Sequence, residues 1–201
     1  MKQTAIDTEY VKELIIKRAM DVFAQKGYHA TNMQDIAEVV GISRGPLYYH
    51  YKNKLELFNK VVDSVFTTMY TDISNIFKQD INIFEKIRQD LLYCADYVNF
   101  IEHARYTVSS DDQEFNLART RFDININELF ELKNKHIRLA IEKKELREDI
   151  LSTELVGMIF VFFGGLRSLN KKVQTIDQQV HKVELERAVD IMVSCLKNEY
   201  S

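Results

Sequence analysis

The uneven placement of glycine and proline constrains this chain more than any other feature of its sequence. The 201 residues include 6 glycines and 1 proline. Gly27, Gly41, Gly45 and Pro46 lie close together near the start, and 110 residues without either type separate Pro46 from Gly157. Because a sheet protein needs a tight turn about every 8–12 residues, this distribution predicts an all-α protein.

Composition and charge limit the class of protein further. Apolar residues make up 46% of the chain and charged residues 28%, which is typical of soluble globular proteins. The longest uncharged apolar run, 156–166, is shorter than the roughly 20 residues of a membrane span, and the first residues lack the apolar core of a secretory signal. Cys94 and Cys195 form no disulfide or zinc pattern. We therefore expect a cytoplasmic protein with reduced thiols and no membrane partner.

The net charge of −3 argues weakly against nucleic acid, but the charge is divided unevenly. Residues 1–60 carry 9 basic and 7 acidic side chains, a net charge of +2. The remaining residues carry 18 basic and 23 acidic side chains, a net charge of −5. The asymmetry is mild and does not by itself indicate a function, but its sign places the excess of basic side chains in the N-terminal part.

Apolar positions three and four residues apart predict the helices. The expected helices cover about 8–26, two short segments between 31 and 52, a long segment from 53, and about 82–104, 112–144, 152–169 and 178–198. Thr31 with Gln34 and Asn53 with Glu56 have capping-box spacing, and Ser43 would cap the helix between them. We expect a three-helix domain over residues 1–52 and a larger helical domain over residues 53–201.

The two short helices between residues 31 and 52 have the dimensions of a helix-turn-helix. In the second, Leu47 and Tyr51 are an apolar i,i+4 pair suited to packing, and His50 lies beside them. The opposite face carries Arg44, Gly45, Tyr48, Tyr49 and Lys52. Arginine can bond guanine edges, tyrosine can contact phosphate and thymine methyl groups, and glycine allows close approach. Two interpretations follow: a helix that reads DNA, or a surface helix whose tyrosines cover the core.

The segment 27–58 resembles the DNA-binding segment of the TetR family of bacterial repressors. The matching positions are Gly27, Tyr28, Thr31, Ile36, Ala37, Gly41, Ser43, Gly45, Leu47, Tyr48, His50, Lys54 and Leu57. Ile42 replaces the usual valine, Tyr51 replaces the usual phenylalanine, and Pro46 occupies a variable position. The rest of the chain resembles the family only in its helical plan.

This resemblance implies that the N-terminal domain binds double-stranded DNA at a palindromic operator. The implied DNA-binding residues are Thr31, Asn32, Gln34, Ser43, Arg44, Gly45, Pro46, Tyr48, Tyr49, His50 and Lys54. Thr31, Asn32 and Gln34 would meet phosphates or a flanking base, and Ser43 would hold a phosphate at a helix N-terminus. Base edges would be contacted by Arg44, Gly45, Pro46 and Tyr49. The DNA backbone would be contacted by Tyr48, His50 and Lys54. His50 has an alternative role as a neutral packing residue.

The central helices carry aromatic stripes beside polar groups, the composition of small-molecule pockets. The resemblance places a small-molecule effector in this region. The candidate pocket residues are Tyr93, Asp96, Tyr97, Phe100, Phe115, Arg119 and Phe122. An aromatic stripe at helical spacing is also typical of a protein core, so both interpretations remain open.

Gly157, Gly164 and Gly165 leave one face of the helix expected over 152–169 without bulky side chains. A glycine inside a helix costs about 1 kcal/mol relative to alanine, and close approach of another helix would compensate. In the TetR family the last two helices of each subunit form a homodimer interface. The implied interface residues are Gly157, Val161, Gly164, Gly165, Leu185, Ala188, Val189 and Met192. A close contact within one chain, or a kink at residues 164–165, would also explain the glycines.

The sequence contains no G-x-S-x-G, P-loop, G-x-G-x-x-G or H-E-x-x-H motif, and its five histidines show no metal-ligand spacing. We therefore expect no enzyme activity, catalytic residue, metal site or cofactor. The expected function is a homodimeric repressor that an apolar or amphipathic ligand releases from its operator. The alternatives are a TetR-like DNA-binding protein without an effector, acting as an activator or a partner-binding chromosomal factor, and a helical enzyme or ligand carrier.

Overall fold

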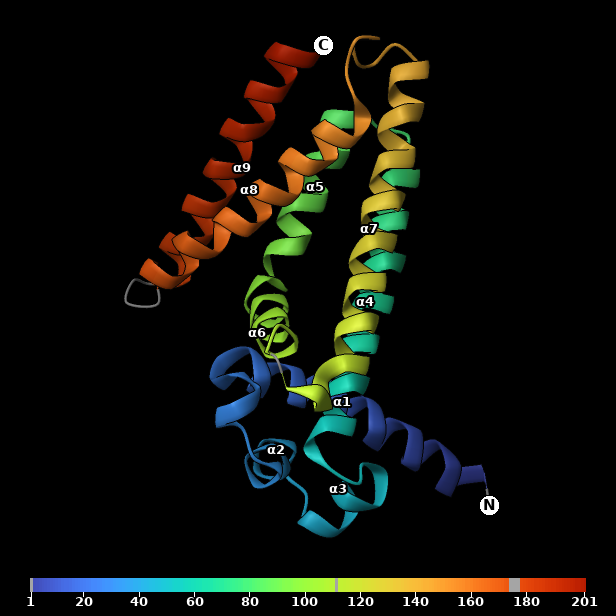
Figure 1. The fold of residues 1–201 in the computed structure, drawn as a ribbon, viewed down its shortest axis with the longest axis vertical. Coiled ribbons are helices and arrows are strands. Elements are labelled where there is room, and N and C mark those ends of the chain that lie inside the picture. Colours follow the sequence, from blue (N-terminus) through green and yellow to red (C-terminus); the bar gives the residue numbers. More distant parts are fainter. Residues whose placement is uncertain (1, 111, 174–177) are drawn as a thin grey trace. The chain divides into compact units, whose positions relative to one another are not determined.

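A computed structural model describes the backbone of residues 2–110, 112–173 and 178–201, and the side chains of residues 8–110, 112–165 and 183–201. Within these residues the chain is all-α without strands, as the sequence predicted. The helices, shown in Figure 1, are α1 (Lys2–Ala30), α2 (Met33–Val40), α3 (Arg44–His50), α4 (Lys54–Lys78), α5 (Ile83–Ala95), α6 (Val98–Val108), the 3-10 helix η1 (Gln113–Phe115), α7 (Asn116–Glu142), α8 (Ser152–Val173) and α9 (Gln178–Tyr200). In this described part, no helix combines the length and apolarity that a membrane crossing requires.

The chain forms two compact units. Unit 1 consists of residues 1–68 and 99–125, and unit 2 consists of residues 69–98 and 126–201. Helices α4 and α7 each contribute residues to both units. Unit 1 therefore contains more than the three helices expected for an N-terminal domain, and the boundary at residue 52 remains a prediction.

Two details of the sequence-based prediction are wrong. The helix expected over 82–104 is divided into α5 and α6, because the backbone turns through i→i−3 hydrogen bonds at Asp96 and Tyr97. A tight turn of this kind contains neither glycine nor proline and preserves the i,i+3 apolar spacing, so the pattern continues across it. The N-cap of α2 is Asn32, paired with Asp35, and Thr31 with Gln34 does not form the expected capping box.

Tyr28 lies in an aromatic cluster of unit 1. Its ring contacts Phe23 of α1, Phe58 of α4 and Phe115 of η1 at centroid distances of 6.1, 5.0 and 5.2 Å. Burial, together with the nearby Glu114 and Asp112 carboxylates, raises the pKa of Tyr28 to about 12. The C-terminal end of α1 therefore packs directly against a segment that lies almost ninety positions further along the chain.

Gly27 breaks the helical geometry just before this cluster. Its φ of 73° and ψ of 168° lie in a region that is essentially restricted to glycine. A Cβ at this position would also lie 2.9 Å from Nδ1 of His103 in α6. Backbone conformation and close approach thus both require glycine, in agreement with the helix end predicted here.

An ion pair is buried in the core of unit 2. Lys133 of α7 and Asp90 of α5 are 5% and 0% exposed, and Lys133 Nζ lies 2.6 Å from Asp90 Oδ2. Burial acts to lower the pKa of Lys133, but the Asp90 carboxylate outweighs it and the pKa is raised. Cys94 Sγ donates to the other carboxylate oxygen at 3.4 Å, and burial raises the pKa of this thiol. Since either charge alone would be costly at this depth, each holds the other in place.

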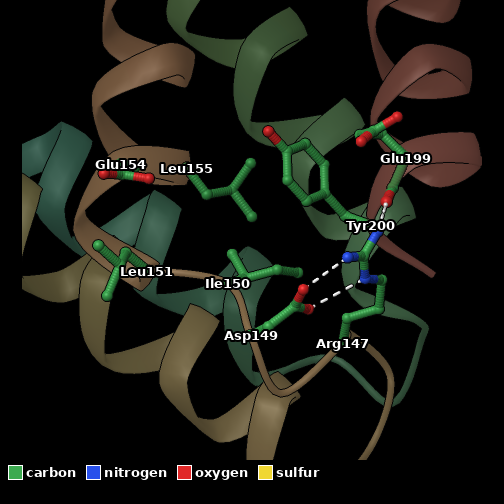
Figure 2. A pocket seen from close by; sticks show the side chains of 8 residues that line it. All are labelled: Arg147, Asp149, Ile150, Leu151, Glu154, Leu155, Glu199 and Tyr200. Carbon is green, nitrogen blue, oxygen red and sulfur yellow. Dashed lines mark hydrogen bonds and ion pairs between the residues drawn. The ribbon is translucent and has the colours of Figure 1, made fainter.

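The connection between α7 and α8 is attached to the end of α9 through Arg147 (Figure 2). The Arg147 backbone N–H donates to the Tyr200 carbonyl at 3.1 Å, and its Nη1 donates to the Glu199 carbonyl at 3.0 Å. Asp149 accepts two hydrogen bonds from the same guanidinium and holds it in this orientation. A cation beside the last carbonyls of a helix satisfies them and opposes the helix dipole, so this contact fixes the C-terminal turn of α9.

We expect Gly27→Ala to lower the free energy of unfolding by about 2–4 kcal/mol, from backbone strain and the displacement of His103. Gly41→Ala is the matched control, because Gly41 also has a positive φ of 79° but a Cβ added there would meet no atom within 4 Å. It should cost about 1–2 kcal/mol. Urea unfolding measures both, and equal losses would show that the contact with His103 contributes nothing.

Candidate nucleic-acid interface

Helix α2 has well-defined ends that set its position relative to α3. At its start, Asn32 Oδ1 accepts from the Asp35 N–H at 2.9 Å and Asp35 Oδ2 accepts from the Asn32 N–H at 3.3 Å. The Asn32 backbone bond and the Lys26 ammonium hold the pKa of Asp35 below its usual value. At its end, the Gly41 N–H bonds the last carbonyls from a left-handed conformation. These hydrogen bonds fix both ends of α2, and thereby the position at which the turn into α3 begins.

Two residues anchor α3. Leu47 is 0% exposed and Tyr51 is 5% exposed, which confirms that this i,i+4 pair packs inward. Burial is the main cause of a raised pKa at Tyr51. Ser43 is the N-cap of the helix, but its hydroxyl makes no capping hydrogen bond. The first turn of α3 therefore keeps a hydroxyl that can serve an external acceptor or donor.

The other side of α3 is exposed, and we call Arg44, Gly45, Pro46, Tyr48 and Tyr49 the exposed face of α3. Tyr49 is 81% exposed and Tyr48 is 48% exposed. His50 is half-buried, and its ring lies 5.1 Å from that of Tyr49. The alternative interpretation, a surface helix whose tyrosines cover the core, requires Tyr48 and Tyr49 to be buried. Their exposure does not agree with it.

A chain of polar side chains from α2 holds Arg44. The Arg44 Nε–H donates to Gln34 Oε1, and Gln34 Nε2 donates to Glu38 Oε1 at 2.7 Å. Gln34 was expected to contact DNA itself; the structure places its amide between Glu38 and Arg44. Glu38 was not among the predicted site residues, although its i,i+4 spacing from Gln34 was visible in the sequence. The arrangement orients a guanidinium on the exposed face of α3.

Thr31 and Lys54 have internal roles that differ from the phosphate contacts implied by the resemblance. Thr31 is 1% exposed, and its hydroxyl donates to the Gly27 carbonyl at 2.7 Å. Lys54 Nζ donates to the carbonyls of Tyr28 and Thr31, both at 2.8 Å, and lies 4.2 Å from the centre of the Tyr28 ring. Desolvation lowers the pKa of Lys54, although Glu114 acts in the opposite direction. Both side chains hold the corner between α1 and α2.

The candidate pocket residues are distributed over both units. In unit 2, the Tyr93 hydroxyl donates to Asp72 Oδ2 at 2.7 Å and lies 3.4 Å from the Tyr97 hydroxyl. Burial, followed by these two partners, raises the pKa of Tyr93. Asp96 is exposed. The sequence did not identify Asp72 as the partner of Tyr93.

The other candidate pocket residues belong to unit 1. Phe100, Phe115 and Phe122 are at most 2% exposed. The Phe122 ring packs edge-on against Phe66 at 5.3 Å. Arg119 donates to the carbonyls of residues 108 and 110 and thereby holds the loop before η1. These residues form core and loop contacts, and a ligand role for them remains a prediction.

The candidate dimer residues of α8 face outward. Val161 is 78% exposed, and Gly164 and Gly165 are exposed. A Cβ at Gly157, Gly164 or Gly165 would meet no atom of the described residues within 4 Å. The glycines therefore serve no close contact within the described part of the chain.

On α9 the candidates lie deeper. Val189 is 0% exposed, and Leu185, Ala188 and Met192 are half-buried. Val183 and Ile191, which were not among the predicted interface residues, are 61% and 58% exposed. An outward apolar surface is thus present on both helices, and its role as a dimer interface remains a prediction.

We expect Lys54→Met to lower the free energy of unfolding by about 1.5–3 kcal/mol, because it removes charged hydrogen bonds to two carbonyls. Lys52→Met is the control, since Lys52 is exposed and its replacement should change stability by less than about 0.5 kcal/mol. Thermal and urea unfolding of both variants measure the difference. An unchanged stability for Lys54→Met would exclude the structural role given to its ammonium.

The comparisons with known proteins point to the same segment. Residues 15–61 match the family model of bacterial regulatory proteins, tetR family. The negative transcriptional regulator IcaR of the biofilm operon icaADBC of Staphylococcus epidermidis is 43% identical over 56 residues, which cover 28% of this chain and 30% of IcaR. The transcriptional regulator TtgR of Pseudomonas putida is 34% identical over 68 residues, covering 34% of this chain and 32% of TtgR. The chain spans about a third of the length of these relatives.

Solved structures extend the similarity of fold to most of the chain. A regulator of the TetR/AcrR family superposes with a TM-score of 0.75 at 13% identity, covering 92% of this chain and 99% of its own. The transcriptional regulator FadR of Bacillus subtilis, solved in complex with stearoyl-CoA, superposes with a TM-score of 0.69 at 16% identity, covering 90% and 97%. At these identities the similarity shows the fold. The proteins named here are all transcriptional regulators.

Proposed function

We propose that this chain is a dimeric transcriptional repressor of the TetR type that reads a palindromic operator with α3, on the premise that its residues 15–61 match the family model of bacterial regulatory proteins, tetR family. The exposed face of α3 carries this proposal. It combines an oriented guanidinium with two adjacent tyrosines, on a helix whose other side is buried. Arginine and tyrosine in this arrangement suit base edges and phosphates.

The proposed partner is the major groove of double-stranded DNA. Arg44 and Tyr49 would face base edges, with Gly45 and Pro46 allowing close approach. Asn32, Ser43, Tyr48 and His50 would contact the backbone on either side. In a dimer, two copies of α3 would enter successive major grooves, which lie about 34–36 Å apart.

Thr31, Gln34 and Lys54 act in this proposal mainly as positioning residues. Gln34 holds Arg44, and the other two hold the corner from which α2 begins. Their replacement would therefore affect DNA binding through the position of α3, in addition to any contact that they make with DNA.

We expect Tyr49→Ala to weaken binding by about 1–3 kcal/mol and to relax base preference. The probe is a DNA fragment from upstream of the protein's own gene, on which a footprint first locates the operator. Tyr106→Ala on α6 is the matched control, since Tyr106 is 75% exposed and lies outside the exposed face of α3. Titration at several salt concentrations separates base contacts from phosphate contacts. Unchanged affinity of Tyr49→Ala would show that the recognition helix is oriented differently.

For the dimer we propose α8 and α9 as the interface, with Gly157, Gly164 and Gly165 allowing the close approach of a second chain. The outward position of Val161 and the open space around the glycines support this arrangement. Ile191 of α9 extends the apolar surface. In the proposed interface, α8 and α9 of one subunit would pack against α8 and α9 of the other. The glycines of α8 would lie in this contact.

Val161→Arg should weaken dimerisation by about 2 kcal/mol or more, because it places an unpaired charge at the centre of this interface. Leu117→Arg is the control: Leu117 is also an exposed apolar residue, at 61%, but lies on α7. Sedimentation velocity at micromolar concentration gives the association state of each protein. A wild-type monomer under these conditions, or a dimer unaffected by Val161→Arg, contradicts the proposed interface.

The proposed effector is a small apolar or amphipathic molecule, bound in the cytoplasm, that lowers operator affinity. The FadR neighbour was solved with stearoyl-CoA, which supports an effector of this general type. Because α4 contributes to both units, we propose that it carries the effector's influence to the DNA-binding helices. A preference of the effector for one state by about 1–3 kcal/mol would suffice.

A further inference from the structure

Unit 2 contains a hollow of about 240 Å³ that has no part in the functions proposed above. It lies where the end of α4, the start of α5 and the C-terminal part of α7 come together. Drug-sized ligands occupy pockets of about 300–1,000 Å³. This hollow therefore suits a smaller group, such as the anionic end of a small molecule.

Its charged lining is predominantly basic. Lys78 is the last residue of α4, Lys86 lies on α5, and Lys143 directly follows α7. Among the described residues, none of these three has a carboxylate oxygen within 4.0 Å, although Asp80 and Glu145 also line the hollow. Three lysines from three segments of the chain thus line one hollow without ion pairs.

The two carboxylates do not cancel this charge. Glu145 Oε2 accepts a hydrogen bond of 2.8 Å from the Ile83 backbone N–H. It therefore acts as the anion at the start of α5, where free N–H groups and the helix dipole favour negative charge. Glu145 keeps its negative charge in this bond, so it and Asp80 together oppose three lysines, and the lining retains an excess of positive charge. The wall of the hollow thus already binds one carboxylate from its own chain.

His136 lies in this field of positive charge. Its ring stacks on Phe77 at a centroid distance of 5.1 Å, which fixes the imidazole within the lining. Burial, and then the charges of Lys86, Lys135, Lys78 and Lys143, lower its pKa. These effects favour the neutral imidazole, and an anion beside it would favour the charged form.

From the three lysines that line this hollow without ion pairs, we propose that Lys78, Lys86, Lys143 and His136 form a binding site for a phosphate-bearing small molecule. A phosphoryl group offers several oxygens to ammonium groups that approach from different sides, and lysine binds phosphate as a point charge. The site is separate from α3 and does not depend on DNA binding. Failure of the repressor proposal would leave it untouched.

The site should bind its anion together with a proton. A bound dianion favours the charged imidazole and raises the pKa of His136. Anion affinity should therefore increase as pH falls through the pKa of His136 in the complex, and decrease as pH rises above it. The charged groups around the imidazole are Lys78 from α4, Asp80 from the following loop, Lys86 from α5, Lys135 from α7, and Lys143 and Glu145 from the segment after α7.

The experiment uses the full chain with pyrophosphate as the probe. The Cε1–H signal of His136 is followed by NMR against pH, in pyrophosphate and in chloride of equal ionic strength, and is identified by its loss in His136→Gln. We expect pyrophosphate to raise the pKa of His136. Isothermal titration calorimetry should show binding that weakens about tenfold or more in the double variant Lys86→Gln/Lys143→Gln. Inorganic phosphate, titrated in parallel, shows whether one phosphoryl group is enough.

Two controls separate this site from general attraction of anions. Lys60→Gln removes an exposed lysine of α4 that does not line the hollow, and it should leave pyrophosphate binding unchanged. In the free double variant the pKa of His136 should rise, because two of the charges that lower it are gone. Equal pKa values in pyrophosphate and chloride, or equal affinity of the double variant and the wild-type protein, would overturn the proposal.

Discussion

Unit 1 is arranged around α3, a helix that is too short to be stable by itself. Helix α3 has seven residues, whereas isolated helices shorter than about 12–15 residues are marginal in water. Its stability must therefore come from packing, which Leu47 and Tyr51 provide on one side. The side chains on the opposite side of α3 are therefore not needed for packing. The same short length that makes α3 dependent on its neighbours lets it present a nearly continuous polar and aromatic face.

The support for α3 comes from distant parts of the chain as well as from adjacent ones. Lys54 joins the start of α4 to the carbonyls at the end of α1, and Tyr28 packs against Phe115 of η1. Gly27 allows α6 to approach the same corner. The three N-terminal helices are therefore completed by residues 99–125. These contacts explain why residues 99–125 belong to the same compact unit as the three N-terminal helices, while the domain boundary at residue 52 remains a prediction.

Local patterns allowed prediction of the all-α class and of the two sides of α3, because the i,i+4 spacing of Leu47 and Tyr51 is a property of one helix. The roles of Thr31 and Lys54 could not be predicted, since the acceptors of Lys54 lie 23 and 26 residues away. Thr31 and Asn32 are both good N-caps, and only burial of the threonine decides between them. The sequence predicts one helix where the structure has α5 and α6, because the apolar spacing continues across the turn between them. Outside residues 15–61, the predicted roles of residues in ligand binding and dimerisation are supported only by the resemblance and by the exposure of side chains.

The lysines of unit 2 show how burial determines which charges are available to a ligand. Lys133 lies in the core, where an unpaired ammonium would be too costly, and Asp90 neutralises it. Lys78, Lys86 and Lys143 line an open hollow, where water can solvate an ammonium without an ion pair. A charge that needs no partner for folding can remain uncompensated until an anion arrives. Positive charge capable of binding a ligand is therefore expected at the hollow and not at the buried pair, although unit 2 belongs to the acidic part of the sequence.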